Sequence, residues 1–261
     1  MTRALSLFLL VVATACATVE PGVPAAAKEE LAPTGKLRVA LLASNPVLVT
    51  QNTPPGVVKG VAVDIAERLA NRLGVPMAPV LYPSLLTLME GTIKREWDIT
   101  FLAVDPDRAA AMNFTAPYMY AESTFLVPAG STANRIEDLD RTGKTIVAVA
   151  RSTQEAWLRK NLGSATVIAA SSPAAARQMM KDGKVDAYAS LKAVLAEASR
   201  EIPGSRLVAG SFDDSPIALA VIRGRPSADA FAYEFMQELK ASGAIREAID
   251  REGLAGARLA N

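Results

Sequence analysis

The sequence predicts an α/β protein of two lobes. Each lobe is expected to be an open, mostly parallel sheet flanked by helices, with two extended crossings between the lobes. Short apolar runs that suit buried strands alternate with segments of helical periodicity. The alternation breaks at residues 114–118 and then starts again, which indicates a second unit inserted into the first. The 261 residues are 50% hydrophobic and only 5% aromatic, which suits one or two ordinary domains.

The N-terminus has the features of an export signal. Arg3 is followed by an apolar stretch over residues 4–15 that is too short to span a bilayer, so residues 1–15 are expected to be a signal peptide. Cys16, the only cysteine, directly follows a small-residue cleavage site, and this placement resembles a bacterial lipoprotein signal. Ala13 stands where leucine is usual, so plain cleavage beside an incidental cysteine is the alternative. Residues 16–35 are rich in Ala, Pro and Glu without periodicity, and we expect a disordered tether.

The first lobe is expected to cover residues 36–124. Its predicted elements are strands at 37–42, 75–81 and 99–104, a helix from Gly60 to a glycine C-cap at Gly74, and a helix at 85–96. This order is a β-α-β-α-β series, which is typical of an open parallel sheet built from right-handed crossovers.

The third strand leads into a candidate anion site. Asp105 is a good N-cap and Pro106 suits the first helical position, so Arg108 falls in the first turn of a helix at a strand end. Free N–H groups, the positive end of the helix dipole and a guanidinium would converge there, which suits a carboxylate or a phosphate. On these residues alone, a surface arginine beside a routine cap is an equal alternative.

The second lobe is expected at residues 125–216, with a return to the first lobe over 217–261. Its predicted strands are 145–150, 165–169 and 185–189. Predicted helices start at Ser152, at Ser172-Pro173 and at Ser190, and a strand at 217–222 precedes one or two helices within 226–251. Ser152 and Glu155 have the spacing of a capping box.

Composition excludes several kinds of function. The formal charge is +1, so nothing indicates a basic surface for nucleic acid. The chain has no His and one Cys, which excludes zinc sites, Ser-His-Asp triads and internal disulfides. We expect no metal, no cofactor and no catalytic residue.

Five motifs in order resemble the bacterial extracellular solute-binding proteins of family 3, the receptors of polar amino-acid ABC importers. The motifs are Gly60-Val-Ala-Val-Asp-Ile, Asp105-Pro-Asp-Arg108, Phe114-Thr-Ala-Pro-Tyr118, Gly143-Lys-Thr-Ile with Ser152-Thr-Gln-Glu155, and Gly183-Lys-Val-Asp-Ala187. The resemblance covers residues 36–251. It implies the two-lobed periplasmic binding protein fold of type II.

The resemblance also implies ligand contacts. Arg108 matches the arginine that pairs with the ligand carboxylate, a bidentate contact that Lys would not reproduce. Ser152 and Thr153 match the second-lobe group that binds the same carboxylate, so anion binding would favour lobe closure. The remaining implied contacts depart from the family pattern: Asn45 replaces an aromatic lid, and Phe101 and Ala103 replace small hydroxyl residues.

Leu191 is the sharpest departure. Amino-acid binders of this family place there an Asp that accepts the ligand ammonium, and a buried ammonium without a partner costs roughly several kcal/mol. Other acceptors considered are Asp105, Glu122 and the pair Asp213 and Asp214. The solute is therefore expected to be either a carboxylate without an α-amine or an amino acid held in an altered way.

The resemblance implies a monomeric receptor that captures a small carboxylate or amino-acid-like solute and delivers it to an ABC permease at the inner membrane. It would be periplasmic or extracytoplasmic, with Cys16 as a lipid anchor. Two alternatives remain: a cyclohexadienyl-dehydratase-like enzyme, which would turn over prephenate or arogenate, and a sensory ligand-binding module without a neighbouring permease.

Overall fold

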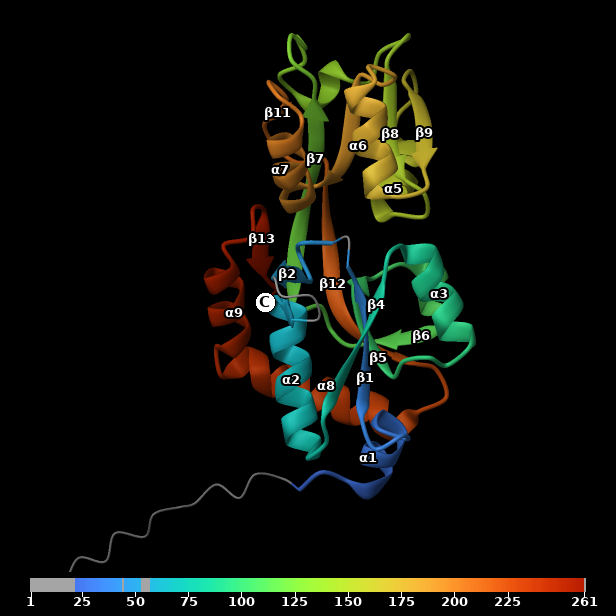
Figure 1. Cartoon of the computed structure of the whole chain (residues 1–261), viewed down its shortest axis with the longest axis vertical. Coiled ribbons are helices and arrows are strands. Elements are labelled where there is room, and N and C mark those ends of the chain that lie inside the picture. The colour runs from blue at the N-terminus through green and yellow to red at the C-terminus, as the bar shows by residue number, and fades with distance from the viewer. Residues whose placement is uncertain (1–21, 44, 53–56, 261) are drawn as a thin grey trace, which may run out of the picture.

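The computed structural model describes residues 22–43, 45–52 and 57–260. Two lobes lie one above the other, and the long strands β7 and β12 pass between them (Figure 1). Helices α1, α2, α3, α8 and α9 surround the lower lobe, while α5, α6 and α7 surround the upper one. The fold class expected from the sequence is confirmed. The expectations for residues 1–21, including the signal peptide and Cys16, lie outside the described residues.

One hydrogen-bonded path runs through both lobes in the order β4-β1-β5-β12-β7-β10-β8-β9. Strands β1, β4 and β5 pair in parallel, as do β8, β9 and β10, whereas β12 and β7 pair antiparallel to their neighbours. The strands of the path are β1 (Leu37–Leu42), β4 (Met77–Tyr82), β5 (Ile99–Ala103), β7 (Met119–Val127), β8 (Thr145–Val149), β9 (Thr166–Ala170), β10 (Ala187–Leu191) and β12 (Asp213–Ile222).

Short strands complete the sheets. They are β6 (Met112–Phe114) on β12, β11 (Arg206–Leu207) and β13 (Ala257–Leu259) on β7, and the separate hairpin of β2 (Thr50–Asn52) with β3 (Val57–Lys59). Strand β13 lies beside the start of β7, where Arg258 covers the Tyr120 ring and donates to Asp214 on β12. The C-terminal part of the chain therefore contacts both crossing strands.

The helices follow the local signals in the sequence. They are α1 (Ala25–Leu31), α2 (Val61–Leu73), α3 (Leu85–Ile93), α4 (Pro106–Ala109), the 3-10 helix η1 (Ile136–Asp138), α5 (Thr153–Asn161), α6 (Pro173–Lys181), α7 (Lys192–Glu201), α8 (Pro226–Ala241) and α9 (Ala244–Glu252). Gly74 ends α2 in the left-handed conformation, with φ +63°, as the C-cap signal predicts. Within the described part of the chain, no helix has both the length and the apolar character needed to cross a membrane.

The expected tether over residues 16–35 is wrong for its C-terminal part. Residues 25–31 form helix α1, and its Ala27 and Leu31 are completely buried in the main core. Glu30 also accepts a hydrogen bond from the Ala228 N–H at the start of α8. Composition misled here because a short helix with two buried apolar positions needs its partner helix, and no local pattern reveals that partner.

Candidate functional site

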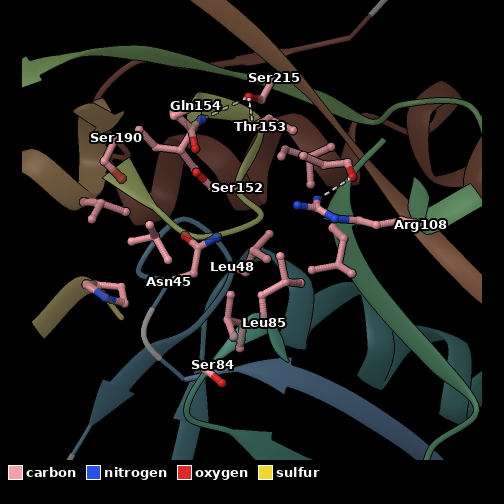
Figure 2. Close-up of a pocket in the computed structure, with 18 residues that line it drawn as sticks. Asn45, Leu48, Ser84, Leu85, Arg108, Ser152, Thr153, Gln154, Ser190 and Ser215 are labelled. Atoms are coloured by element: carbon pink, nitrogen blue, oxygen red, sulfur yellow. Dashed lines mark hydrogen bonds between the residues drawn. The ribbon is translucent and has the colours of Figure 1, made fainter. Parts of the chain in front are cut away.

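A cavity of about 100 Å³ lies between the lobes, with 18 residues lining it (Figure 2). This is small beside the roughly 300–1,000 Å³ of pockets for drug-sized ligands, so it suits a small solute. The first lobe contributes Leu42, Asn45, Leu48, Ser84, Leu85, Leu102, Ala103 and Arg108; the second contributes Val149, Ser152, Thr153, Gln154, Pro173, Ser190, Leu191 and Val194; and β12 contributes Ser215 and Ile217.

Arg108 reaches the cavity because of the way β5 turns into α4. The Asp105 carboxylate accepts from the N–H groups of Asp107 (3.0 Å) and Arg108 (3.3 Å), which fixes the first turn. The Arg108 side chain then extends into the cavity (Figure 2). Its guanidinium donates to the Ala103 carbonyl in the same lobe at 2.8 Å and to the Arg151 carbonyl in the other lobe at 3.2 Å. The residue is only 7% exposed.

The charge of Arg108 has no acidic partner among the described residues, because no carboxylate there lies within salt-bridge distance of its guanidinium. Burial lowers the pKa of Arg108 below its ordinary value, while Asp105 and Asp107 act in the opposite direction from farther away. Only neutral carbonyl oxygens are bonded to this cation. A buried cation in that state favours binding of an anion, since a buried charge without a counter-charge is costly and an anion offsets that cost.

The N-terminus of α5 contributes a second positive pole from the other lobe. Ser152 is its N-cap, and the Ser152 hydroxyl accepts from the Glu155 N–H at 3.1 Å. The N–H groups of Thr153 and Gln154, at the first two helical positions, have no acceptor within the helix. They add the positive end of the helix dipole to the cavity that Arg108 borders.

Arg151, just before this helix, has a left-handed backbone with φ +62°. This conformation costs a non-glycine residue about 1–2 kcal/mol. The Arg151 carbonyl accepts from Arg108, and its N–H donates to the Glu155 carboxylate at 2.6 Å. The Glu155 half of the predicted capping box is thus displaced by one residue, from the N-cap N–H to that of Arg151.

Two lining residues that the sequence did not reveal, Gln154 and Ser215, connect α5 to the crossing strands. The Gln154 amide donates to the hydroxyls of Ser123 on β7 (2.8 Å) and Ser215 on β12 (3.3 Å). The hydroxyls of Thr153 and Ser215 are 3.1 Å apart. Only the position of Gln154 in the first turn after Ser152 could have indicated a role, because Ser215 reaches the site through tertiary contacts.

Of the other predicted ligand contacts, some line the cavity and some do not. Asn45, Ala103 and Leu191 line the cavity. Phe101 does not: it is 1% exposed and packs edge-on against Tyr118, with ring centroids 6.0 Å apart. That expectation is wrong because only the end of β5 borders the cavity, and Phe101 lies two residues deeper.

Asp105 is also misplaced as a lining residue. Its carboxylate caps α4 and borders a neighbouring surface depression instead. Of the other acceptors considered for an ammonium, Glu122 is paired with Lys192 and Asp214 with Arg258. None of these acidic residues lines the cavity.

Known proteins resemble this chain over most of its length. The glutamine-binding protein GlnH of an ABC transporter of Bacillus subtilis is 23% identical over 201 residues, covering 76% of this chain and 73% of the relative. A cyclohexadienyl dehydratase of Pseudomonas aeruginosa is 27% identical over 140 residues, covering 51% of each chain.

Solved structures share the fold. An amino acid ABC transporter substrate-binding protein, AbpA from Streptococcus pneumoniae, bound to L-arginine, superposes with a TM-score of 0.74 at 21% identity, over 86% of this chain and 97% of its own. The family model of the bacterial extracellular solute-binding proteins, family 3, matches residues 37–251. The chain therefore belongs to the bacterial extracellular solute-binding proteins of family 3.

Proposed function

We propose that this protein is the extracytoplasmic receptor of an ABC importer and captures a small carboxylate-bearing solute, an amino acid or a related acid, by closure of its lobes. One observation carries the proposal: Arg108 is buried between the lobes and bonded only to neutral carbonyl oxygens. The α5 N-terminus supplies a second positive pole from the opposite lobe. An anion that contacts both poles is bound best when the lobes are closed.

Calorimetry and thermal shift test this function directly. The probes are small carboxylic acids, including glutamine and other amino acids, each paired with the amide made from its carboxylate. Carboxylates should raise the melting temperature by mass action, and their amides should not. Small-angle scattering should show a smaller radius of gyration with the bound acid. Equal stabilisation by a bound acid and by its amide would contradict an anion receptor.

A dehydratase activity is the alternative that the Pseudomonas relative raises. Such chemistry needs a general acid close to the substrate. Arg108 is the one ionisable side chain among the described residues that line the cavity, and its guanidinium stays protonated. The cavity therefore favours binding over proton transfer, and we expect no turnover of prephenate or arogenate, as followed by product absorbance.

The location of the protein is part of the proposal. We expect cleavage before Cys16 and lipidation of its thiol, with delivery of the solute to a permease at the inner membrane by a monomeric receptor. Cys16→Ser should move the native protein from the membrane fraction to the soluble fraction. Mass spectrometry that finds an unmodified N-terminus elsewhere would rule out this anchor.

A further inference from the structure

We propose that the cavity selects small carboxylates whose α-carbon bears no ammonium group, namely α-keto or α-hydroxy acids with a short apolar chain. This inference rests on the proposed function, because it names the solute class of the same cavity.

The charge of the cavity is the first argument. Arg108 is the one formally charged residue among the 18 that line it, so the described lining carries a charge of +1. The α5 N-terminus adds partial positive charge. A monoanion neutralises this lining, whereas a zwitterionic amino acid adds no net charge and leaves the buried +1 in place.

The second argument is that a ligand ammonium meets no counter-charge. The described lining contains no Asp or Glu and no aromatic ring, so both a salt bridge and a cation–π contact are missing there. The segments outside the described structure, residues 1–21, 44, 53–56 and 261, contain a single acidic residue, Glu20. An ammonium would therefore depend on neutral oxygens alone.

Those neutral oxygens are largely engaged already. The Asn45 side-chain oxygen accepts from the Val47 N–H at 3.0 Å. The Ser215 hydroxyl lies within hydrogen-bond distance of both Thr153 and Gln154. A keto or hydroxyl oxygen needs only one donor or acceptor, which a serine hydroxyl such as that of Ser190 provides, whereas an ammonium must satisfy three donors.

The acidic residues considered above as ammonium acceptors are engaged elsewhere, and the Asp105 carboxylate caps α4. Glu122 pairs with Lys192, and Asp214 pairs with Arg258. Asp213 lies on β12 opposite Ser123 and outside the cavity lining. None can turn to an ammonium in the cavity without losing its present environment.

The remaining lining residues indicate what kind of chain the carboxylate solute carries. Away from Arg108 the surface is mostly aliphatic, formed by Leu42, Leu48, Leu85, Leu102, Val149, Leu191, Val194 and Ile217. Aliphatic walls favour an alkyl chain, which gains about 0.8 kcal/mol per buried methylene. The small volume limits the length of that chain.

Calorimetry with matched acids tests the inference. The probes are alanine, lactate and pyruvate; valine and α-ketoisovalerate; and leucine, α-hydroxyisocaproate and α-ketoisocaproate. The best keto or hydroxy acid should bind at least about tenfold more tightly than its amino counterpart, because the ammonium is desolvated without a partner. Equal or tighter binding of the amino acids overturns this inference and leaves the proposed function intact. Binding of neither class, with no response to any other carboxylate, overturns both.

A pair of variants supplies a second test at Leu191, the N-cap of α7, which lacks a side-chain cap bond. Asp and Asn both serve well as N-caps, so Leu191→Asp and Leu191→Asn should fold. Leu191→Asp should reverse the preference toward the amino acid and weaken the keto acid by at least about tenfold. Leu191→Asn removes the same apolar surface without adding charge, so it should weaken both classes and retain their order. An unchanged order in Leu191→Asp would count against the inference.

Discussion

Two buried arginines of this protein, Arg108 and Arg225, are equally shielded from solvent but differ in their partners. Each is 7% exposed. Arg225 donates at 2.9 Å to Asp98, a completely buried carboxylate that also accepts from the Arg38 backbone and guanidinium. Arg108 has only two backbone carbonyls. The comparison indicates that a buried cation paired with a carboxylate supports the fold, while one left with neutral acceptors is available to a ligand.

The largest expected effect is at the paired site. Asp98→Asn removes the charge shared by Arg38 and Arg225 and should lower the free energy of unfolding by about 3–5 kcal/mol, the usual cost of breaking a buried pair. Urea denaturation measures this loss. Asp214→Asn, which breaks an exposed pair with Arg258, is the control and should cost at most about 1 kcal/mol. Similar losses in the two variants would contradict the role given to Asp98.

At Arg108, which has no acidic partner among the described residues, substitution should affect solute binding more than stability. Arg108→Met should cost about 2–5 kcal/mol of binding free energy for a carboxylate solute, because the buried anion loses its counter-charge. Its effect on the free energy of unfolding should be smaller than that of Asp98→Asn, because no carboxylate loses a partner.

Arg225→Met is the matched control for this second prediction. It should lower the free energy of unfolding while leaving solute affinity unchanged in calorimetry, since Arg225 does not line the cavity. The distinction between the two arginines fails if Arg108→Met retains full affinity, or if both variants lose affinity equally.

A smaller effect is expected at Arg151, whose carbonyl accepts from Arg108. Arg151→Gly should raise the free energy of unfolding by at most about 1–2 kcal/mol, because glycine adopts φ +62° without the strain of a side chain. The carbonyl remains, so affinity should persist. Thermal denaturation and calorimetry check the two parts, and a large loss of affinity would instead assign a ligand contact to the Arg151 side chain.

The smallest effect concerns Asp213, an acidic counterpart of Arg108 in that it has no ion pair among the described residues. Burial raises the pKa of Asp213 above its ordinary value, and the negative charge of Asp214 adds to the shift, whereas hydrogen bonds from the Asp214 N–H and the Ser215 hydroxyl oppose it. The folded state therefore holds this proton to higher pH than the unfolded state, and stability falls as pH rises between the two pKa values.

Asp213→Asn should accordingly be more stable than the unmodified protein at neutral pH, and the gain should vanish in acid below the ordinary pKa. Urea denaturation across this pH range measures the gain. A constant difference between the two proteins at all pH values would show that Asp213 titration is not its origin.

Local chemistry explains which parts of the site the sequence could predict. The Asp105-Pro106 helix start and the Ser152 N-cap depend on neighbouring residues, and both occur as expected. Strand ends are harder: β10 extends to Leu191 rather than to Ala189, so residues assigned to a helix start complete a strand beside the cavity.

Tertiary contacts account for the remainder. The Gln154 network depends on β7 and β12 meeting α5, and Phe101 is removed from the cavity by its packing on Tyr118. No sequence periodicity or motif predicts these tertiary contacts between distant segments. Helix α1 was not predicted for the same reason, because its two buried residues are covered by packing against α8, a distant segment of the chain.

Helix α1 would also limit how far the protein extends from a membrane under the proposed lipidation of Cys16. It lies at the end of the lower lobe that points away from the upper lobe (Figure 1). A free tether from Cys16 to residue 36 would span at most about 70 Å, whereas the segment from Cys16 to the start of α1 spans at most about 30 Å. An anchor at Cys16 would therefore hold the α1 end of the molecule close to the bilayer and restrict the orientations in which the receptor meets a permease.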